Sequence, residues 1–385
     1  MRRVYLDHSA TTPIRPEVLE AMLPYLRERY GNPSSLHHWG QEAKKAVEQA
    51  REAVAALISA RPEEIVFTSG GTEADNLAVI GAAYANAAKG RHIITSSIEH
   101  HAVLDSMQYL ERQGFKVTFL PVTAEGLVQV DEVGAAITPE TILISIMHAN
   151  NEVGTVQPVA LIGQLAKEKG IILHSDAVQS AGKIPVDVDE LGVDLLTLSA
   201  HKIYGPKGVG ALYVRKGTRL DPIFHGGAQE RKRRPGTENT PGIVGFGRAA
   251  ALAKQEMATE ARRLAALRDR LLDGLIKRIP DLVITGHREK RLPNHASVCV
   301  KYVEGESLLL SLDLQGVAAS SGSACTSGSL EPSHVLLAMG LPHEVAQGSL
   351  RLTLGRENKE ADVDYVLEIL PPIVERLRAM SPLRC

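Results

Sequence analysis

Lys202 is the residue of this sequence whose type and position most directly suggest chemistry. It lies in SAHKIYGPKG (199–208), immediately after the apolar run DLLTLS (194–199). A lysine at the end of a buried strand is rarely there for packing, because burying an ammonium group is costly. The position suits an amine nucleophile. Taken alone the motif favours an exposed loop lysine, so the neighbouring motifs decide its interpretation.

Two further polar segments also follow apolar runs. Asp176, in HSDAVQS (174–180), comes after IILHS, where a buried carboxylate needs a cationic or hydrogen-bonding partner. Its alternative role is that of a helix cap. The segment SGGTEADN (69–76) follows EIVFTS and leads into a helix, so it forms either an anion-binding cup or an ordinary turn capped by Thr72.

These segments together match the needs of one cofactor. Pyridoxal phosphate (PLP) requires a lysine for its aldehyde, a carboxylate for its pyridine nitrogen and an anion cup for its phosphate. Ligands of parallel sheets bind beyond the carboxyl ends of the strands, where all three segments are expected. Two more residues follow strands: His100 could stack on a ring or transfer protons, and Asn151, in HANNEVG, could donate to a ring oxygen. A capping or core histidine and a turn asparagine are the alternatives.

The elements that must position these residues are visible as an alternation of short apolar runs and helical stretches. Runs that are apolar throughout suit strands buried on both faces. We expect strands at 64–69, 92–96, 116–122, 141–147, 171–175, 194–199 and 210–214, with helices at 41–58, 73–89 and 159–169. This pattern predicts an α/β fold with a mostly parallel, seven-stranded sheet between helices.

The second part of the chain has a different pattern. A long helix is expected at 258–278, then strands at 297–302 and 349–354 and helices at 305–314 and 360–379. We therefore predict a large domain of residues 13–257. A smaller α+β domain would consist of residues 1–12 and 258–385, and a loop at about 320–333 would belong to it.

Composition excludes several classes of protein. The 385 residues carry a net charge of −2, and 44% are hydrophobic, as in an ordinary globular protein. No apolar run is long enough to span a membrane, and we see no signal peptide. Three cysteines are too few for a disulfide framework or an intrinsic metal site, which suggests the cytoplasm. The basic run 231–234 is interpreted as a solvated loop, without direct binding of nucleic acid.

At this point the motifs resemble a known family, the cysteine desulfurases of the NifS/IscS type. These belong to the class V aminotransferase group of fold-type I PLP enzymes. The matching motifs occur in the family's order along the whole chain: YLDHSATTP (5–13), GNPSS (31–35), TSGGTEADN (68–76), EHHAVL (99–104), HANNEVG (148–154), DAVQSAGK (176–183), SAHKIYGPKG (199–208), PGTENTPGIVG (235–245), SSGSACTSGSLEPSHVL (320–336) and RLTLGR (351–356).

The resemblance implies a role for each motif residue. Lys202 would bind the PLP aldehyde and move the substrate's Cα proton, Asp176 would pair with the pyridine nitrogen, and His100 would stack on the ring as an acid or base. Gln179 and Asn151 would hold the ring's phenolic oxygen. The phosphate end of the cofactor site would be formed by Gly71, Thr72, Glu73, Ser199 and His201.

The resemblance also implies a partner subunit and a substrate site. Thr237 would reach the phosphate site of a neighbouring subunit, so a homodimer is expected. Arg351, with Asn151 beside it, would clamp the carboxylate of L-cysteine.

Cys325 distinguishes the possible reactions. It lies in a Ser- and Gly-rich stretch that is expected to be exposed and mobile, whereas Cys299, in SVCVKY, is expected in the core. In the family reaction Cys325 would take sulfur from cysteine as a persulfide, leaving alanine. It would pass the sulfur to an iron–sulfur scaffold of the IscU or NifU kind, where it could share a cluster, or to a tRNA-thiolation protein. Selenocysteine lyase, another class V reaction and a PLP-binding scaffold without turnover remain as alternatives.

Overall fold

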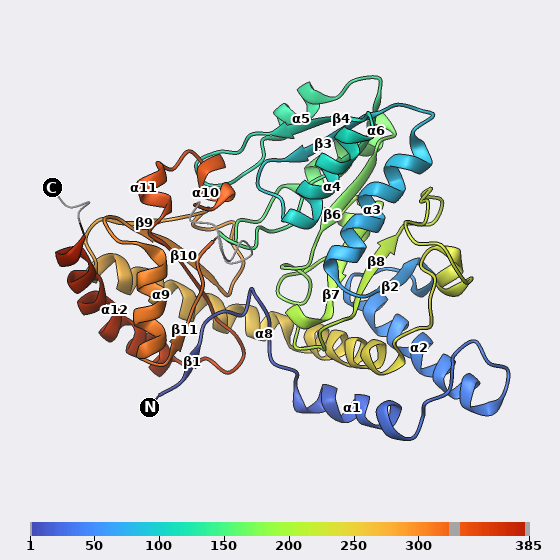
Figure 1. Cartoon of the computed structure of the whole chain (residues 1–385), viewed down its shortest axis with the longest axis horizontal. Coiled ribbons are helices and arrows are strands. Elements are labelled where there is room, and N and C mark those ends of the chain that lie inside the picture. Colours follow the sequence, from blue (N-terminus) through green and yellow to red (C-terminus); the bar gives the residue numbers. More distant parts are fainter. Residues whose placement is uncertain (1, 323–331, 382–385) are drawn as a thin grey trace.

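The computed structural model describes residues 2–322 and 332–381. The two largest sheets lie in different parts of the molecule, and one long helix, α8 (Thr240–Arg278), runs along both parts (Figure 1). Within the described ranges, no helix is long and apolar enough to cross a membrane.

The larger sheet has seven strands in the order β2-β8-β7-β6-β5-β3-β4. All of them run parallel except β8, which is antiparallel to both of its neighbours. The strands are β2 (Ile65–Thr68), β3 (His92–Ser96), β4 (Lys116–Leu120), β5 (Thr141–Ser145), β6 (Ile172–Asp176), β7 (Leu195–Ser199) and β8 (Gly210–Val214). The predicted mostly parallel, seven-stranded α/β fold is confirmed.

Helices cover both faces of this sheet, which explains why most of its strands are buried and rich in apolar residues. Every residue of β2, β3, β5, β7 and β8 is buried. Two separate apolar clusters pack against the sheet: one includes side chains of α2 and α8, and the other includes side chains of α3 and α4. The helices of this part are α1 (Pro16–Arg27), α2 (His38–Leu57), α3 (Gly71–Asn86), α4 (His101–Arg112), α5 (Val130–Ala136), α6 (Val159–Lys169) and α7 (Val188–Leu191), with short 3₁₀ turns η1 (Pro62–Glu64), η2 (Ala200–Lys202) and η3 (Gln229–Lys232).

The smaller part contains a three-stranded antiparallel sheet in the order β12-β10-β9 and a parallel pair, β1 with β11. The first strand of the chain therefore pairs with a segment more than 300 residues later. These elements are β1 (Val4–Tyr5), β9 (Leu282–Ile284), β10 (His295–Val300), α9 (Gly305–Leu314), β11 (Val317–Ala318), α10 (His334–Ala338), α11 (His343–Ala346), β12 (Ser349–Thr353) and α12 (Glu360–Met380).

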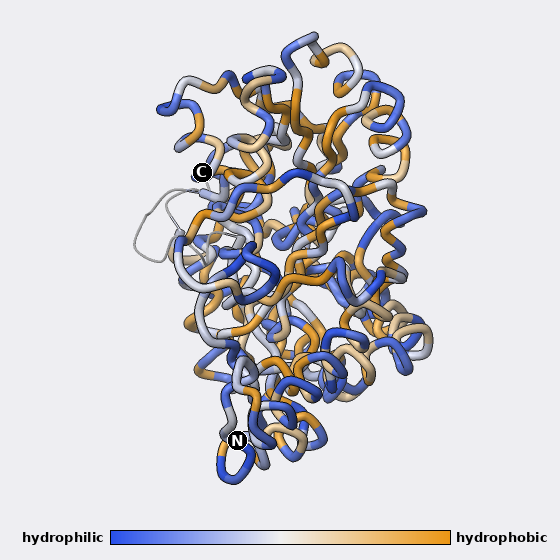
Figure 2. Tube along the Cα trace, turned by 90° about the vertical axis from the view of Figure 1, so that its right-hand side faces the viewer, coloured by the Kyte–Doolittle hydropathy of each residue, from blue (hydrophilic) through white to orange (hydrophobic). Residues whose placement is uncertain are grey.

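The long helix contributes to two different apolar cores. Its first half, including Ile243, Phe246 and Leu252, packs with the seven-stranded sheet, whereas Leu264 to Leu275 pack with the smaller sheet and α12. In Figure 2 hydrophobic segments lie mainly in the interior and hydrophilic segments mainly in the outer loops. The predicted start of this helix at 258 is wrong, because α8 begins at Thr240.

Candidate active site

The site is formed where the parallel strands β3, β5, β6 and β7 end. Because parallel strands share one carboxyl edge, the loops after them lie together. His100 follows β3, Asn151 follows β5, Asp176 ends β6 and Lys202 follows β7 in the turn η2. The sheet therefore gathers residues that are separated by about a hundred positions in the sequence.

Lys202 is held by the N-terminal segment of the chain. Its Nζ donates to the carbonyl oxygens of Ser9 at 2.6 Å and Ala10 at 2.7 Å. Lys202 also contributes to the shifted pKa values of Asp176, His100 and His201, so its charge acts on the surrounding strand ends. The N-terminal segment follows β1 of the smaller part, so both parts of the molecule form this site.

Asp176 is a buried carboxylate that remains able to ionise near neutral pH. Burial raises its pKa to about 6, while a hydrogen bond from the Val178 amide (2.8 Å) and the charge of Lys202 oppose the increase. A buried carboxylate is expected to have a cationic or hydrogen-bonding partner. Asp176 can therefore hold a proton on the nitrogen of a bound heterocycle.

A polar network that the sequence did not suggest lies beside Asp176. His174 of β6 bonds to Ser145 through Nδ1 (2.8 Å) and to Thr197 through Nε2 (3.1 Å). Burial lowers the pKa of His174 to about 3, so the imidazole is neutral. Asp75 of α3 is 3.5 Å from His174, and burial, then the charge of Asp176, raise its pKa well above the ordinary value.

His100 precedes α4 as its N-cap residue. Its Nδ1 accepts a hydrogen bond from the Ala102 amide at 3.1 Å, and burial, then Lys202 and His101, lower its pKa to about 4. A neutral imidazole that accepts at Nδ1 carries its proton on Nε2. His100 can therefore stack on a ring and exchange a proton through Nε2.

The first turn of α3 lies beside the end of β7, at the place where the sequence predicts an anion cup. A Cβ added at Gly71 would lie 3.7 Å from the Ser199 Cβ, so these two residues are neighbours, and the Ser199 Oγ is buried without a hydrogen-bond partner among the described residues. An unpaired hydroxyl beside a helix N-terminus fits a phosphate group. Thr72 is exposed in the same turn, and the His201 Nδ1 bonds to Thr11 at 3.1 Å.

Glu73 and Thr237 lie at the outer side of this cup. The Glu73 carboxylate forms an ion pair with Arg234 at 2.8 Å and accepts from the Ser69 amide at 2.9 Å. Thr237, three residues after Arg234, is exposed. The ion pair therefore holds the segment that carries Thr237 beside the start of α3.

Arg351 of β12 points toward the loop after β5. Its guanidinium donates to the Asn151 carbonyl through Nη1 and to Asp7 through Nη2, both at 3.0 Å. The side chain is buried, and its Nε has no hydrogen-bond partner within the described ranges. A buried guanidinium whose Nε–H is available as a donor can bind a carboxylate.

The segment that carries Cys325 lies outside the described residues, as does Cys385. Its described ends reach the site: Ser320 pairs with the backbone of Arg351, while Ser333 donates through Oγ to the buried Glu152. Cys299 is buried in β10 as expected, and burial raises its pKa to about 12, so it stays an unreactive thiol.

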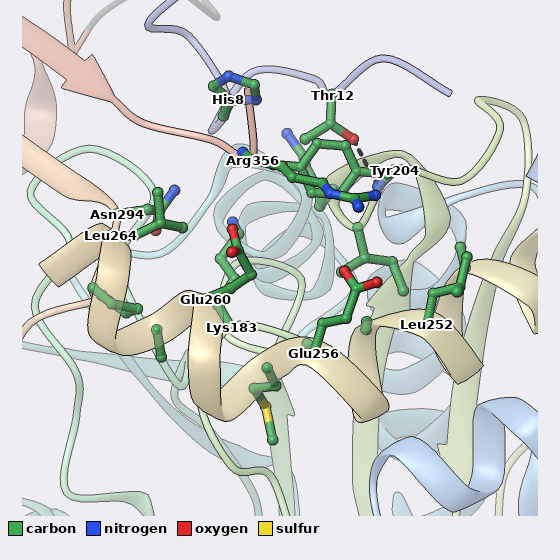
Figure 3. A pocket seen from close by; sticks show the side chains of 18 of the residues that line it. His8, Thr12, Lys183, Tyr204, Leu252, Glu256, Glu260, Leu264, Asn294 and Arg356 are labelled. Carbon is green, nitrogen blue, oxygen red and sulfur yellow. Dashed lines mark hydrogen bonds between the residues drawn. The ribbon is translucent and has the colours of Figure 1, made fainter. Parts of the chain in front are cut away.

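A cavity of about 60 Å³ adjoins Lys202 on the side of α8 (Figure 3). Glu256 and Glu260 project into it from α8, and His8 and Lys183 also line it. Lys183 donates to the Oε1 of Gln179 at 3.2 Å, and Gln179 donates to the Ser9 carbonyl at 3.0 Å. Our sequence interpretation assigned no role to Lys183, although its spacing of four residues from Gln179 was a usable signal.

Comparisons with known proteins agree with this geometry. The family described as Aminotransferase class-V matches residues 4–366. Proteins named cysteine desulfurase IscS from Dictyoglomus turgidum and Methanosarcina thermophila are 56% and 58% identical to this chain, covering 99% of it and 97% and 94% of their own lengths.

Solved structures give the same result. A NifS-like protein is 42% identical with a TM-score of 0.92, covering 98% of this chain and all of its own. A structure described as SspA in complex with cysteine is 39% identical with a TM-score of 0.80, covering 91% of this chain and 98% of its own. The chain therefore belongs to the aminotransferase class-V family and, within it, to the cysteine desulfurases of the IscS type.

Proposed function

We propose that the chain is a PLP-dependent cysteine desulfurase, which converts L-cysteine to L-alanine and transfers the sulfur to Cys325 as a persulfide. The observation that carries the proposal is the convergence of Lys202, Asp176 and His100 with the unpaired Ser199 hydroxyl at one edge of the sheet. The full-length relatives named cysteine desulfurase support the choice of reaction.

The chemistry of the residues present supports PLP at its phosphate and at its pyridine nitrogen. Gly71, Thr72, Ser199 and His201 would hold the phosphate, and Asp176 would hold the proton on the pyridine nitrogen. When bound, PLP supplies an electron sink for carbanion chemistry at the Cα of an amino acid.

Side chains of the protein would orient the substrate and transfer its protons. Arg351 and Asn151 would orient the carboxylate of cysteine, and the Nζ of Lys202 would carry the Cα proton. The Nε2 of His100 offers a second group for proton transfer at the leaving sulfur. Because burial lowers the pKa of His100 to about 4, its neutral ring would take part through the proton on Nε2.

Cys325 would complete the reaction. Its thiolate attacks the substrate sulfur, so that an S–S bond forms while the substrate Cβ–S bond breaks and its electron pair stays with carbon. Protonation of that carbon gives alanine, and the net change is thiol plus cysteine to persulfide plus alanine. No external oxidant is needed. The pairing of Ser320 with Arg351 supports a loop that starts beside the substrate carboxylate.

We also propose a homodimer, in which Thr237 of one subunit reaches the phosphate of the other, and a thiol-reducing, cytoplasmic setting. The sulfur acceptor would be an iron–sulfur scaffold protein or a tRNA-thiolation protein. The exposed position of Thr237 supports the dimer, since it leaves this side chain available to a second chain.

The test is Cys325→Ala, assayed for alanine and sulfide from L-cysteine in the presence of a reductant. We expect loss of sulfide release with the absorbance of bound PLP retained, because the variant loses only the sulfur-accepting thiol. Cys385→Ala is the matched control and should keep full activity. Undiminished sulfide release by Cys325→Ala would refute the proposal, and activity on selenocysteine alone would point to a lyase.

A further inference from the structure

Lys183 is an ionisable group in the interior that the mechanism above does not use, and burial, then the charges of Lys202 and Arg351, lower its pKa to about 7. It follows β6, lines the cavity of Figure 3, and within the described ranges takes part in no ion pair. The charged groups that act on it are Lys202 and Arg351, and both are cations. Burying a charge without a counter-ion is costly, so packing alone does not account for a lysine here.

The other titratable groups around Lys183 do not neutralise it. Burial is the main cause that lowers the pKa values of His8 and His201 to about 4, which leaves both rings uncharged. His295 is neutral for the same reason. The carboxylates that share the cavity are already bound by arginines, Glu256 by Arg15 at 2.7 Å and Glu260 by Arg263 at 2.8 Å.

The hydrogen bond from Lys183 fixes the orientation of the Gln179 carboxamide. Oε1 accepts from Lys183, and Nε2 donates one of its two hydrogens to the Ser9 carbonyl, which also accepts from Lys202. A flipped carboxamide would place its NH₂ group against the ammonium, donor against donor. The second N–H of Gln179 therefore stays on the side of the Ser9 carbonyl, to which Lys202 also donates.

We propose that Lys183 is a positioning residue for cofactor binding: by donating to Gln179 Oε1 it keeps the amide NH₂ directed into the site. The inference rests on the proposed function and on the role that the family resemblance implies for Gln179, whose NH₂ would donate to the phenolic oxygen of PLP. In this proposal Lys183 acts through its hydrogen bond to Gln179.

The experiment is a double-mutant cycle on PLP affinity. Apo-protein of the wild type, Lys183→Met, Gln179→Leu and the double variant is titrated with PLP and followed by absorbance, at pH 6 and pH 8. Lys183→Met should weaken PLP binding about tenfold, as expected for a lost hydrogen bond from a charged donor. In the Gln179→Leu background the same change should have less than about a twofold effect, because it acts through Gln179.

Lys167→Met is the control, since this lysine is exposed on α6 and should leave PLP affinity unchanged. If Lys183→Met does not fold, Lys183→Leu, which also removes the donor, takes its place in the cycle. Equal losses in the two backgrounds, or no loss in either, would overturn the role of Lys183 while leaving the proposed function standing. A wild-type chain that binds no PLP would overturn both.

Discussion

At the scale of single residues, environment decides which of several identical side chains can act. Arg351 is buried with its guanidinium turned toward Asn151 and Asp7, whereas Arg270 lies exposed on α8 and pairs with Asp364. The thiol of Cys299 is unreactive because burial in β10 raises its pKa. The function of a residue type therefore depends on its partners and its burial.

Replacing Arg351 by lysine tests its role as the carboxylate clamp. Lysine keeps the charge but loses the planar pair of donors, so we expect KM for L-cysteine to rise about ten- to a hundredfold, as for a lost charge-assisted hydrogen bond, with a smaller change in kcat. Steady-state kinetics of alanine formation measure both. Arg270→Lys is the control, and an unchanged KM for Arg351→Lys would contradict the clamp.

At the scale of elements, close packing between helices places the strand ends. The helices α2 and α8 approach so closely at Gly247 that an added Cβ would lie 2.5 Å from the Ala50 Cα. This contact belongs to the core that supports the seven-stranded sheet. Position 247 therefore requires glycine because there is no room for a Cβ, and not because of its backbone conformation.

Gly247→Ala tests this packing. In a solvent-exposed helix the change would stabilise the protein by about 1 kcal/mol, because alanine has a higher helix propensity than glycine. Here we expect a loss of about 1–3 kcal/mol in the free energy of unfolding, because the backbone of α2 cannot yield easily. Chemical denaturation measures it. Ala251→Ser, on the exposed face of α8, is the control, and a stabilised Gly247→Ala variant would show that the helices can separate without cost.

At the scale of the whole molecule, the site is assembled from both parts of the chain. The segment after β1 binds Lys202, and β12 supplies Arg351, while the strand ends of the larger sheet supply the remainder. Thr237 is exposed beside the ion pair of Glu73 and Arg234, and in the proposed dimer it would complete the cup of the second chain.

Mixed dimers test this arrangement. The wild type should have a mass in solution about twice the 41.5 kDa of one chain. Thr237→Ala and Lys202→Ala homodimers should each be impaired, but a mixed dimer has one site that combines Lys202 from one chain with Thr237 from the other. We expect mixing to restore PLP binding and activity at that site. No recovery in verified mixed dimers would place Thr237 in its own subunit's site or outside any site.

Much of the fold followed from periodicity alone. The helices at 159–169 and 305–314 occur at the predicted residues, and all seven strands of the larger sheet are present. The short strands β1, β9 and β11 were missed, because two or three residues carry no periodic signal. The first half of α8 was missed because Pro241 and the glycines after it resemble a loop, whereas packing against α2 makes this segment helical.

The sequence by itself determined the residue types of the site and their places at strand ends, since chain order and apolar runs are local properties. The tertiary structure decided the burial, the protonation state and the hydrogen-bond partners of those residues. Only folding sets the neutral state of His100, the unpaired hydroxyl of Ser199 and the contact of Lys183 with Gln179. Desolvation and hydrogen-bond geometry depend on segments distant in the chain, and a linear pattern does not contain them.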